Sequence, residues 1–325
     1  MRALALFSGG LDSVLAMKII IDQGIDVIAV NIDTGFGGTT DRLEHMQNMC
    51  NQIGATLEIL DLKQAYLDEV LFEPKFGYGK NFNPCIDCHG FMFRHTSKLL
   101  KKYNGSFLIS GEVIGQRPMS QNKDALKQVQ KLSDCEDLIV RPLSAKLLPI
   151  SLPEKKGWVD REKLLDISGR GRSRQLQLAK EFGLKDFEPP AGGCLLTEIQ
   201  FSNKLSDFIK NDKLDINDID TLKAGRHLRL PDGAKLIIGR HQEDNKKLEN
   251  TNSDKYYKGR IVGATGPYAL LDKKASDNDK KLAADFIITY GKTETNKEYE
   301  VDFGKIKIKG KKLASKEPIQ QYMIF

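Results

Sequence analysis

Short apolar runs separated by amphipathic segments are the dominant pattern in residues 1–140. The run Ala3–Phe7 precedes an amphipathic stretch from Val14 to Gln23, and the run Val27–Ile32 precedes a helix-like segment that stops at Gly54. Continuous apolar runs of this length are typical of parallel strands buried on both faces, and the segments between them have helical spacing. The pattern therefore predicts an α/β domain with a doubly wound, mostly parallel sheet.

The same alternation continues further along the chain. Ser8, Asp33 and Gly111 each follow an expected strand. Ligands of doubly wound sheets bind at the carboxyl ends of the strands, so we expect these three residues to share one edge of the sheet. The further elements predicted here are strands at Thr56–Leu60, Ser106–Ser110 and Leu138–Val140, and a helix over Leu62–Phe72.

A glycine turn, Ser8-Gly9-Gly10-Leu11-Asp12-Ser13, joins the first strand to the first helix. Glycines let the backbone approach a ligand closely, and the first N–H groups of a helix attract phosphate. Ser8 and Ser13 add hydroxyl donors, and Asp12 suits either a helix cap or a metal near the phosphates. An ordinary glycine-rich turn is the structural alternative.

This hexapeptide resembles the PP-loop of the ATP pyrophosphatase superfamily, and it is not a Walker loop because no Gly-Lys-Ser/Thr follows. The resemblance implies an adenine nucleotide alpha hydrolase-like fold that binds ATP and Mg²⁺ and adenylates a substrate. It places adenine near Ile32 and a second nucleotide-contacting loop at Gly111, while Arg141 begins an Arg-Pro-Leu typical of PP-loop tRNA-modifying enzymes. The nucleotide-binding residues it implies are Ser8, Gly9, Gly10, Leu11, Asp12, Ser13, Ile32, Gly111 and Arg141.

Three of the five cysteines fall in motif-like contexts. The segment from Asn83 to Phe93, with Cys85 and Cys88, resembles the catalytic segment of tRNA 2-thiouridine synthases, although the cysteine at 85 is a departure from that pattern. Cys194, in a glycine-rich turn, corresponds to the second catalytic cysteine of these enzymes. Some relatives hold a 4Fe–4S cluster on a Cys-x-x-Cys pair and one distant cysteine, and this resemblance implies the metal ligands Cys85, Cys88 and Cys194.

Other uses of these cysteines stay open. A closed zinc site needs a fourth ligand, for which His89 is the obvious candidate, and a Cys88–Cys194 pair could instead handle a persulfide without metal. An odd number of unevenly spaced cysteines argues against a disulfide framework. Cys50 and Cys135 are expected to be packed or incidental.

Charge is unevenly distributed along the chain. Residues 1–200 contain 25 Lys/Arg and 25 Asp/Glu, whereas residues 201–325 contain 25 and 19, so the net charge of +6 arises in the second part. This segregation is compatible with an anionic partner such as RNA. The stretch Ser168–Arg174, with Arg170, Arg172 and Arg174, suggests a phosphate-gripping segment for tRNA, with a solvated turn as the alternative.

The pattern changes beyond Thr197. A helix at Glu198–Ile209 and an acidic, linker-like run at Asp212–Asp220 precede a strand–turn–strand pattern over Gly225–Arg240. This part resembles the NFACT-R type domain of ribosome-associated quality-control proteins, which predicts a PP-loop domain at 1–200 and a small basic α+β domain at 201–325. Lys305–Lys312 reads as an edge strand protected by lysines or as a nucleic-acid patch.

These observations favour an ATP-dependent tRNA sulfurtransferase in which Asp12, Cys88 and Cys194 are catalytic. The partners implied are tRNA and a sulfur donor, either a protein or hydrosulfide. A small-molecule adenylating ligase or sulfur-insertion enzyme, and an ATP-switched RNA-binding protein, are the alternatives. Because no signal peptide or membrane-spanning run is recognisable, we expect a cytoplasmic protein without membrane contact.

Overall fold

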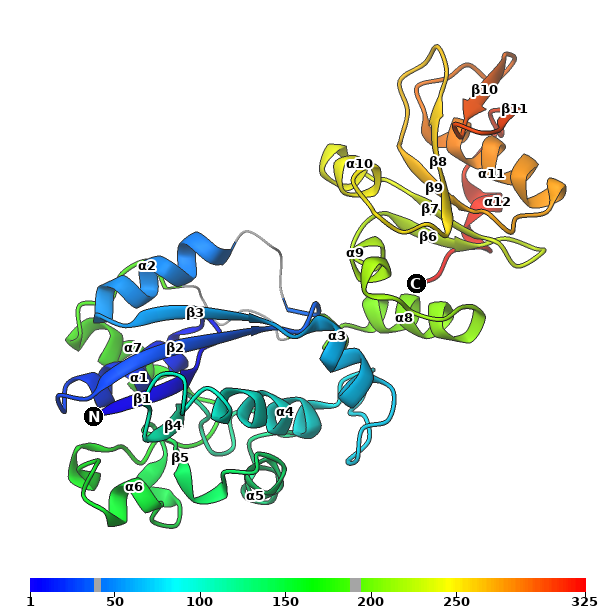
Figure 1. The fold of residues 1–325 in the computed structure, drawn as a ribbon. Helices are drawn as coiled ribbons and strands as arrows, with labels where there is room; N and C mark the ends of the chain where they lie inside the picture. The colour runs from blue at the N-terminus through cyan, green and yellow to red at the C-terminus, as the bar shows by residue number, and fades with distance from the viewer. Residues whose placement is uncertain (38–41, 188–193) are drawn as a thin grey trace. The chain divides into compact units, whose positions relative to one another are not determined.

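The structure is a computed structural model that describes residues 1–37, 42–187 and 194–325. The chain divides into two compact units, Met1–Leu195 and Leu196–Phe325 (Figure 1). Each unit has its own sheet and its own hydrophobic core, and each is described by itself below. Among the helices in the described ranges, none is long and apolar enough to cross a membrane.

The first unit is built on a five-stranded sheet whose neighbouring strands are all parallel. The strand order is β3-β2-β1-β4-β5, so the first strand lies at the centre. Ala3, Leu4 and Ala5 in this strand are at most 1% exposed, which explains why the sequence is apolar without alternation. The strands are β1 (Arg2–Leu6), β2 (Asp26–Asp33), β3 (Thr56–Asp61), β4 (Phe107–Ser110) and β5 (Ile139–Val140).

Helices cover both faces of this sheet, as predicted (Figure 1). The helices are α1 (Leu11–Ile21), α2 (Leu43–Ile53), α3 (Lys63–Tyr66), α4 (Cys85–Ser97), α5 (Lys123–Leu132), α6 (Leu152–Lys155) and α7 (Ser173–Glu181). One core joins α1, α2 and α7 to the sheet face that carries Ala3 and Ala5. The other joins α4 and α5 to the face that carries Leu4. The doubly wound α/β fold is therefore confirmed.

The carboxyl ends of β1, β2 and β4 lie at one edge of the sheet because these neighbouring strands are parallel. Ser8 follows β1, Asp33 ends β2, and Gly111 follows β4 directly. The sequence-based expectation that these three residues share an edge is confirmed by this topology.

The second unit contains a six-stranded antiparallel sheet with the order β11-β10-β8-β9-β7-β6. Its strands are β6 (Arg226–Arg229), β7 (Lys235–Ile238), β8 (Tyr256–Ile261), β9 (Ala269–Asp272), β10 (Glu298–Asp302) and β11 (Lys307–Lys311). Its helices are α8 (Ile199–Asn211), α9 (Ile219–Leu222), α10 (Gln242–Glu249), α11 (Asp277–Tyr290) and α12 (Glu317–Gln320). Helix α11 packs on the sheet and supplies Phe286, Ile287 and Ile288 to the core.

Two local expectations are confirmed, and one needs correction. The helix expected over Leu62–Phe72 is α3 followed by a π-helical turn, Leu67–Leu71. The acidic run 212–220 is not a linker, because it contains the start of α9 and a fully buried Asp218 that accepts hydrogen bonds from Ser253 and Lys255. Strand β11 is an edge strand, as its alternating lysines predict.

Candidate active site

The glycine turn forms a tight loop between β1 and α1. Gly9 has a φ of +79°, in the left-handed region that only glycine adopts easily, and Gly10 is the N-cap residue of α1. The Ser8 hydroxyl oxygen accepts a hydrogen bond from the Gly10 N–H (3.3 Å), and the Ser13 hydroxyl donates to the Gly10 carbonyl (2.7 Å). Leu11 is 3% exposed and packs into the core, so this residue offers a ligand its backbone alone.

Asp12, in the first turn of α1, is held from two sides. Its Oδ2 accepts hydrogen bonds from Gln116 Nε2 (2.5 Å) and from Arg172 Nη2 (3.0 Å). The side chain of Arg172, one of three arginines expected to grip tRNA phosphate, thus points at the glycine loop, and its contact with tRNA stays a prediction. Arg174 is exposed and pairs with Glu181 instead.

Gly111 fixes the second loop directly on the first. A Cβ atom at this position would lie 2.5 Å from the backbone carbonyl carbon of Asp12 and from the backbone nitrogen of Ser13. Any side chain larger than hydrogen would therefore displace the first turn of α1. The sequence resemblance placed Gly111 near the nucleotide, and the structure places it against the PP-loop backbone.

Arg141 is buried and Ile32 is half-buried. Arg141 is 3% exposed; its Nε donates to Glu112 Oε2 (2.8 Å), and its guanidinium lies 5.9 Å from the ring centre of Phe93. Ile32 is half-buried in β2 and pairs with Leu60 of β3. The nucleotide contacts expected of these two residues stay predictions.

A buried carboxylate connects this edge of the sheet to the cysteine helix α4. Glu112, which follows Gly111, is 5% exposed, and its Oε1 lies 2.7 Å from His89 Nδ1. Burial by itself raises the pKa of the Glu112 carboxyl, but the charge of Arg141 and the hydrogen bond to His89 outweigh it and lower that pKa to about 2. Glu112 is therefore ionised at neutral pH and fixes the ring of the residue that follows Cys88.

Cys85 and Cys88 lie in the first turn of α4. Cys85 Sγ accepts a hydrogen bond from Asn83 Nδ2 (3.2 Å), and Cys88 is hydrogen-bonded to the hydroxyl of Tyr66. Burial, followed by the negative charges of Cys194 and Cys85, raises the pKa of the Cys88 thiol well above its usual value. The three cysteines singled out in the sequence are thus close enough to act on one another electrostatically.

A backbone hydrogen bond and two aromatic contacts link the residue after Cys194 to α4. The backbone N–H of Leu195, the next residue, donates to the carbonyl of Phe36 in the loop after β2 (3.0 Å). The ring of Phe36 packs on Tyr66 at 5.8 Å, and Tyr66 packs on Phe91 of α4 at 5.7 Å. The glycine-rich turn expected before Cys194 includes Ala191, Gly192 and Gly193, which lie outside the described residues.

The chemistry of three thiols suits zinc or an iron–sulfur cluster, because thiolates are the preferred protein ligands of both. Within residues 1–37, 42–187 and 194–325, however, no group of three or more His, Cys, Asp or Glu side chains is already placed to hold a metal ion. The remaining cysteines are in other environments. Cys50 is fully buried in α2, where burial raises the pKa of its thiol to about 11, and Cys135 is half-buried.

Sequence reasoning missed the roles of His89 and Arg172. Glu112 and Gln116 are polar residues that follow β4, and they contact His89 and Gln175, which lie 23 and 59 positions away. Gln116 accepts a hydrogen bond from Gln175 (3.1 Å). The only local signal was a charged or amide side chain placed next to a glycine at the carboxyl edge of the sheet.

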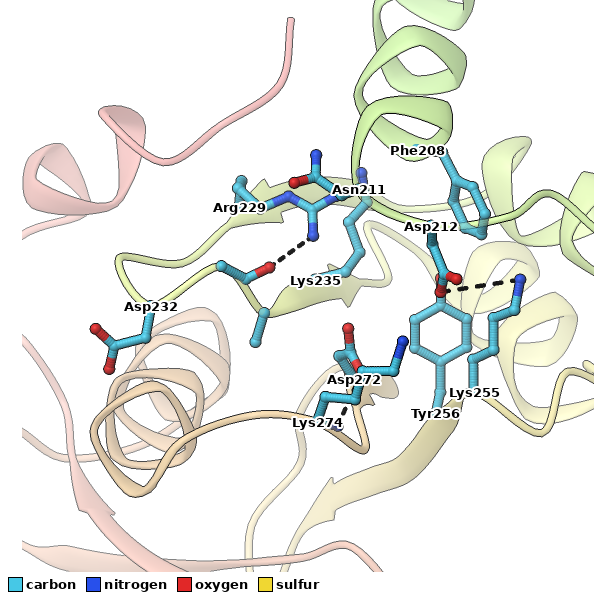
Figure 2. Close-up of a pocket in the computed structure, with 12 residues that line it drawn as sticks. Phe208, Asn211, Asp212, Arg229, Asp232, Lys235, Lys255, Tyr256, Asp272 and Lys274 are labelled. Carbon is cyan, nitrogen blue, oxygen red and sulfur yellow. Dashed lines mark hydrogen bonds and ion pairs between the residues drawn. The ribbon is translucent and has the colours of Figure 1, made fainter.

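The second unit contains a polar cavity of about 200 Å³ between the end of α8 and one end of the sheet (Figure 2). Asp207 holds both Arg229 (2.7 Å) and Lys235 (2.5 Å), and burial lowers the pKa of Lys235 to about 8. Lys255 is paired with Asp218. Because these cations are already neutralised by carboxylates, the cavity is not a strongly positive site. It is lined by Phe208, Asn211, Asp212, Arg229, Asp232, Gly233, Ala234, Lys235, Lys255, Tyr256, Asp272 and Lys274.

Two family models match the chain. Residues 1–146 match the family described as thiamine biosynthesis protein (ThiI), and residues 225–323 match the NFACT protein RNA binding domain. The first match contains the glycine loop and the Cys85–Cys88 pair, and the second contains all six strands of the antiparallel sheet. The resemblances to PP-loop tRNA sulfurtransferases and to an NFACT-R type domain are therefore confirmed.

Individual proteins are similar to parts of this chain. A probable tRNA sulfurtransferase of Thermococcus kodakarensis is 27% identical over 172 residues, which cover 51% of this chain and 40% of that protein. The tRNA-specific 2-thiouridylase MnmA of Bacillus licheniformis is 25% identical over 248 residues, which cover 70% of this chain and 60% of that protein. A crystal structure of a 4-thiouridine synthetase–RNA complex with bound ATP aligns over 68% of this chain and 52% of that chain, with 18% identity and a TM-score of 0.41. The chain thus spans about half the length of these relatives.

Proposed function

We propose that this chain, in which a PP-loop domain precedes an NFACT-type RNA-binding domain, is an ATP-dependent tRNA sulfurtransferase. One observation carries the proposal. Gly111 packs on the backbone of Asp12 in the PP-loop, and the next residue, Glu112, holds His89, which directly follows Cys88. A candidate nucleotide loop and a candidate sulfur-handling site are therefore joined through two consecutive residues. Adenylation followed by sulfur transfer needs both sites within reach of one uridine.

The first chemical step activates the uridine. Its carbonyl oxygen attacks the α-phosphorus of ATP, the bond from that phosphorus to the bridging oxygen breaks, and pyrophosphate leaves. The backbone of Gly9 and Gly10 and the N-terminus of α1 would bind the phosphates, with the hydroxyls of Ser8 and Ser13 beside them. Mg²⁺ would bind at Asp12 Oδ1, a buried oxygen without a hydrogen-bond partner in the described residues, and would offset phosphate charge.

The second step exchanges oxygen for sulfur. A sulfur nucleophile attacks the activated carbon, the carbon–oxygen bond breaks, and AMP leaves with the uridine oxygen. In the route without metal, a persulfide on Cys88 or Cys194 supplies the terminal sulfur. The other cysteine then attacks the bridging sulfur, which releases thiouridine and leaves a disulfide that an external thiol reduces.

The alternative route uses metal. Cys85, Cys88 and Cys194 would hold a 4Fe–4S cluster, which when bound supplies an open iron position for hydrosulfide. The two routes differ in their need for Cys85, because a persulfide and a resolving thiol require two cysteines only. The sulfur donor would be a persulfide-carrying protein in the first route and hydrosulfide in the second.

The test separates activation from sulfur transfer. With tRNA, Cys88→Ser and Cys194→Ser should still release pyrophosphate but form no thiouridine, because adenylation does not need the thiols. Asp12→Ala should lose both products. Cys135→Ser is the matched control, because Cys135 is a half-buried cysteine outside this group. This variant should still form both pyrophosphate and thiouridine. Wild-type protein that releases no pyrophosphate with any tRNA would contradict the proposed function.

Iron and sulfide content of anaerobically purified protein distinguishes the two sulfur routes. If the protein contains iron and Cys85→Ser loses it together with thiolation, the cluster route stands. If the parent protein contains no iron and Cys85→Ser stays fully active, the persulfide route stands.

A further inference from the structure

Arg172 reaches the PP-loop from a segment that is docked firmly on the loop after β4. The Gly169 N–H donates to the carbonyl of Ile114 (2.7 Å), and Ser168 pairs with Ile114 as an isolated parallel bridge. Arg172 is the N-cap residue of α7, a helix that packs against α1 in the same core. The position of this side chain at the nucleotide edge is therefore built into the fold of the first unit.

The two oxygens of the Asp12 carboxylate, which Arg172 contacts, differ in their hydrogen bonds. Asp12 Oδ2 accepts two hydrogen bonds, from Gln116 and Arg172, whereas Oδ1 is buried and accepts none in the described ranges. Gln116 is itself oriented by Gln175, which is fully buried. Asp12 is thus fixed by one oxygen, and its other oxygen is left for a cation.

Arg172 supplies positive charge beside the Asp12 carboxylate at the N-terminus of α1. A carboxylate in the first turn of α1 repels a polyphosphate bound at that helix end unless positive charge lies beside it. The Arg172 side chain is 23% exposed, and its bond to Asp12 uses one of its donors. In the described structure its guanidinium has no other hydrogen-bond partner, so the remaining donors of its planar fork are available to phosphate oxygens.

We infer that Arg172 binds the β- and γ-phosphates of ATP and stabilises the negative charge of pyrophosphate as it leaves. Asp12 orients the guanidinium through Oδ2. This inference rests on the proposed function for its place in the reaction, and it replaces the expectation that Arg172 grips tRNA. Arg172 makes no covalent bond during the reaction. It acts through charge-assisted hydrogen bonds alone.

The test uses the full chain and inorganic pyrophosphate with Mg²⁺ as the probe, measured by titration calorimetry. Arg172→Gln should weaken pyrophosphate binding by about 10- to 100-fold, the usual worth of one to two lost charge-assisted hydrogen bonds, and should change AMP affinity less than about twofold. Arg174→Gln is the matched control, because Arg174 lies in the same stretch but pairs with Glu181, and it should bind pyrophosphate like the wild type.

Equal pyrophosphate affinity of Arg172→Gln and wild type overturns the inference, as does an equal loss of AMP and pyrophosphate binding, which would indicate a collapsed loop. If Arg172→Gln does not fold, Arg172→Lys is used; its affinity should fall at least about threefold, since an ammonium cannot replace a planar fork, and unchanged affinity overturns the inference. If Arg172→Gln lowers the salt dependence of tRNA binding but leaves pyrophosphate binding intact, Arg172 binds tRNA phosphate and the inference is overturned.

Failure of this inference can be distinguished from failure of the proposed function. Pyrophosphate binding that depends on Arg172 in a protein that thiolates no tRNA would leave the inference standing and remove the proposed function. If the protein thiolates tRNA but Arg172→Gln leaves its pyrophosphate affinity unchanged, the inference is overturned and the proposed function stands.

Discussion

At the scale of single residues, Glu112 is the group on which the candidate site depends most. Its carboxylate accepts hydrogen bonds from Arg141 and Ser110 and lies against His89, and both it and Arg141 are almost fully buried. A buried ion pair adds little net stability compared with apolar packing, but removing one partner leaves the other charge uncompensated. Glu112 is therefore a residue whose loss should be felt in both stability and site geometry.

Glu112→Gln should lower the free energy of unfolding at pH 7 by about 3–5 kcal/mol, because it leaves the Arg141 guanidinium buried without a counter-charge. Urea unfolding measures this. Glu69→Gln is the control: Glu69 forms an exposed pair with Arg94 (2.6 Å), so its loss should cost less than about 1 kcal/mol. Equal stability of the two variants would contradict the buried-pair account.

The lowered pKa of Glu112 adds a pH dependence to the same comparison. Because the folded-state pKa of about 2 is below the ordinary value of 4.5, the stabilisation is complete above the unfolded-state pKa and is lost as pH falls toward 2. By pH 3 the wild type should have lost about 2 kcal/mol through this group, and Glu112→Gln should lack that component.

Residue roles were predictable from the sequence only where a motif carries them. The stretch from Ser8 to Ser13 and the Cys85–Cys88 pair were recognisable because each is contiguous and chemically unusual. The contacts of Arg172 with Asp12 and of His89 with Glu112 were not, since they join residues 160 and 23 positions apart with no local pattern. The burial of Arg141 and its ion pair with Glu112 were not predictable either, because these two residues lie 29 positions apart.

At the scale of elements, the parallel strands do most to place the candidate site. Strand β4 brings Gly111 against the first turn of α1, and this contact has no room for a side chain. Element types were predictable because apolar runs buried on both faces differ clearly from amphipathic helices. The folded structure of the run 212–220 was not, because the carboxylate of the buried Asp218 is satisfied by Ser253 and Lys255, which are far along the chain.

Gly111→Ala tests this packing. The new Cβ would press on backbone atoms of Asp12 and Ser13, so the variant should lose about 1–3 kcal/mol of unfolding free energy and most of its response to Mg–ATP. Denaturant unfolding and the shift of Tm by Mg–ATP measure the two effects. Gly37→Ala, where a Cβ would meet no heavy atom within 4 Å, is the control for stability, and equal stability of the two variants would refute the contact.

At the scale of the whole molecule, two units with different chemistry form one chain. The first carries the PP-loop and the cysteines, and the second carries the RNA-binding family match and the net positive charge. The charge segregation was readable from the sequence. The sequence could not show how these charges are used. In the cavity of the second unit, Arg229 and Lys235 are neutralised by Asp207, and Lys255 is neutralised by Asp218. If this unit binds RNA, as its family match implies, we predict that the RNA contacts its outer surface and not this cavity.

The most direct test of tRNA thiolation is mass spectrometry of nucleosides from total tRNA, compared between cells with and without the gene for this chain. We expect one thiolated uridine to disappear on deletion, to return with the wild-type gene, and to stay absent with Cys88→Ser or Asp12→Ala. Cys135→Ser should restore it, which shows that loss with Cys88→Ser is specific to that thiol. An unchanged set of thiolated nucleosides in the deletion strain would contradict the account.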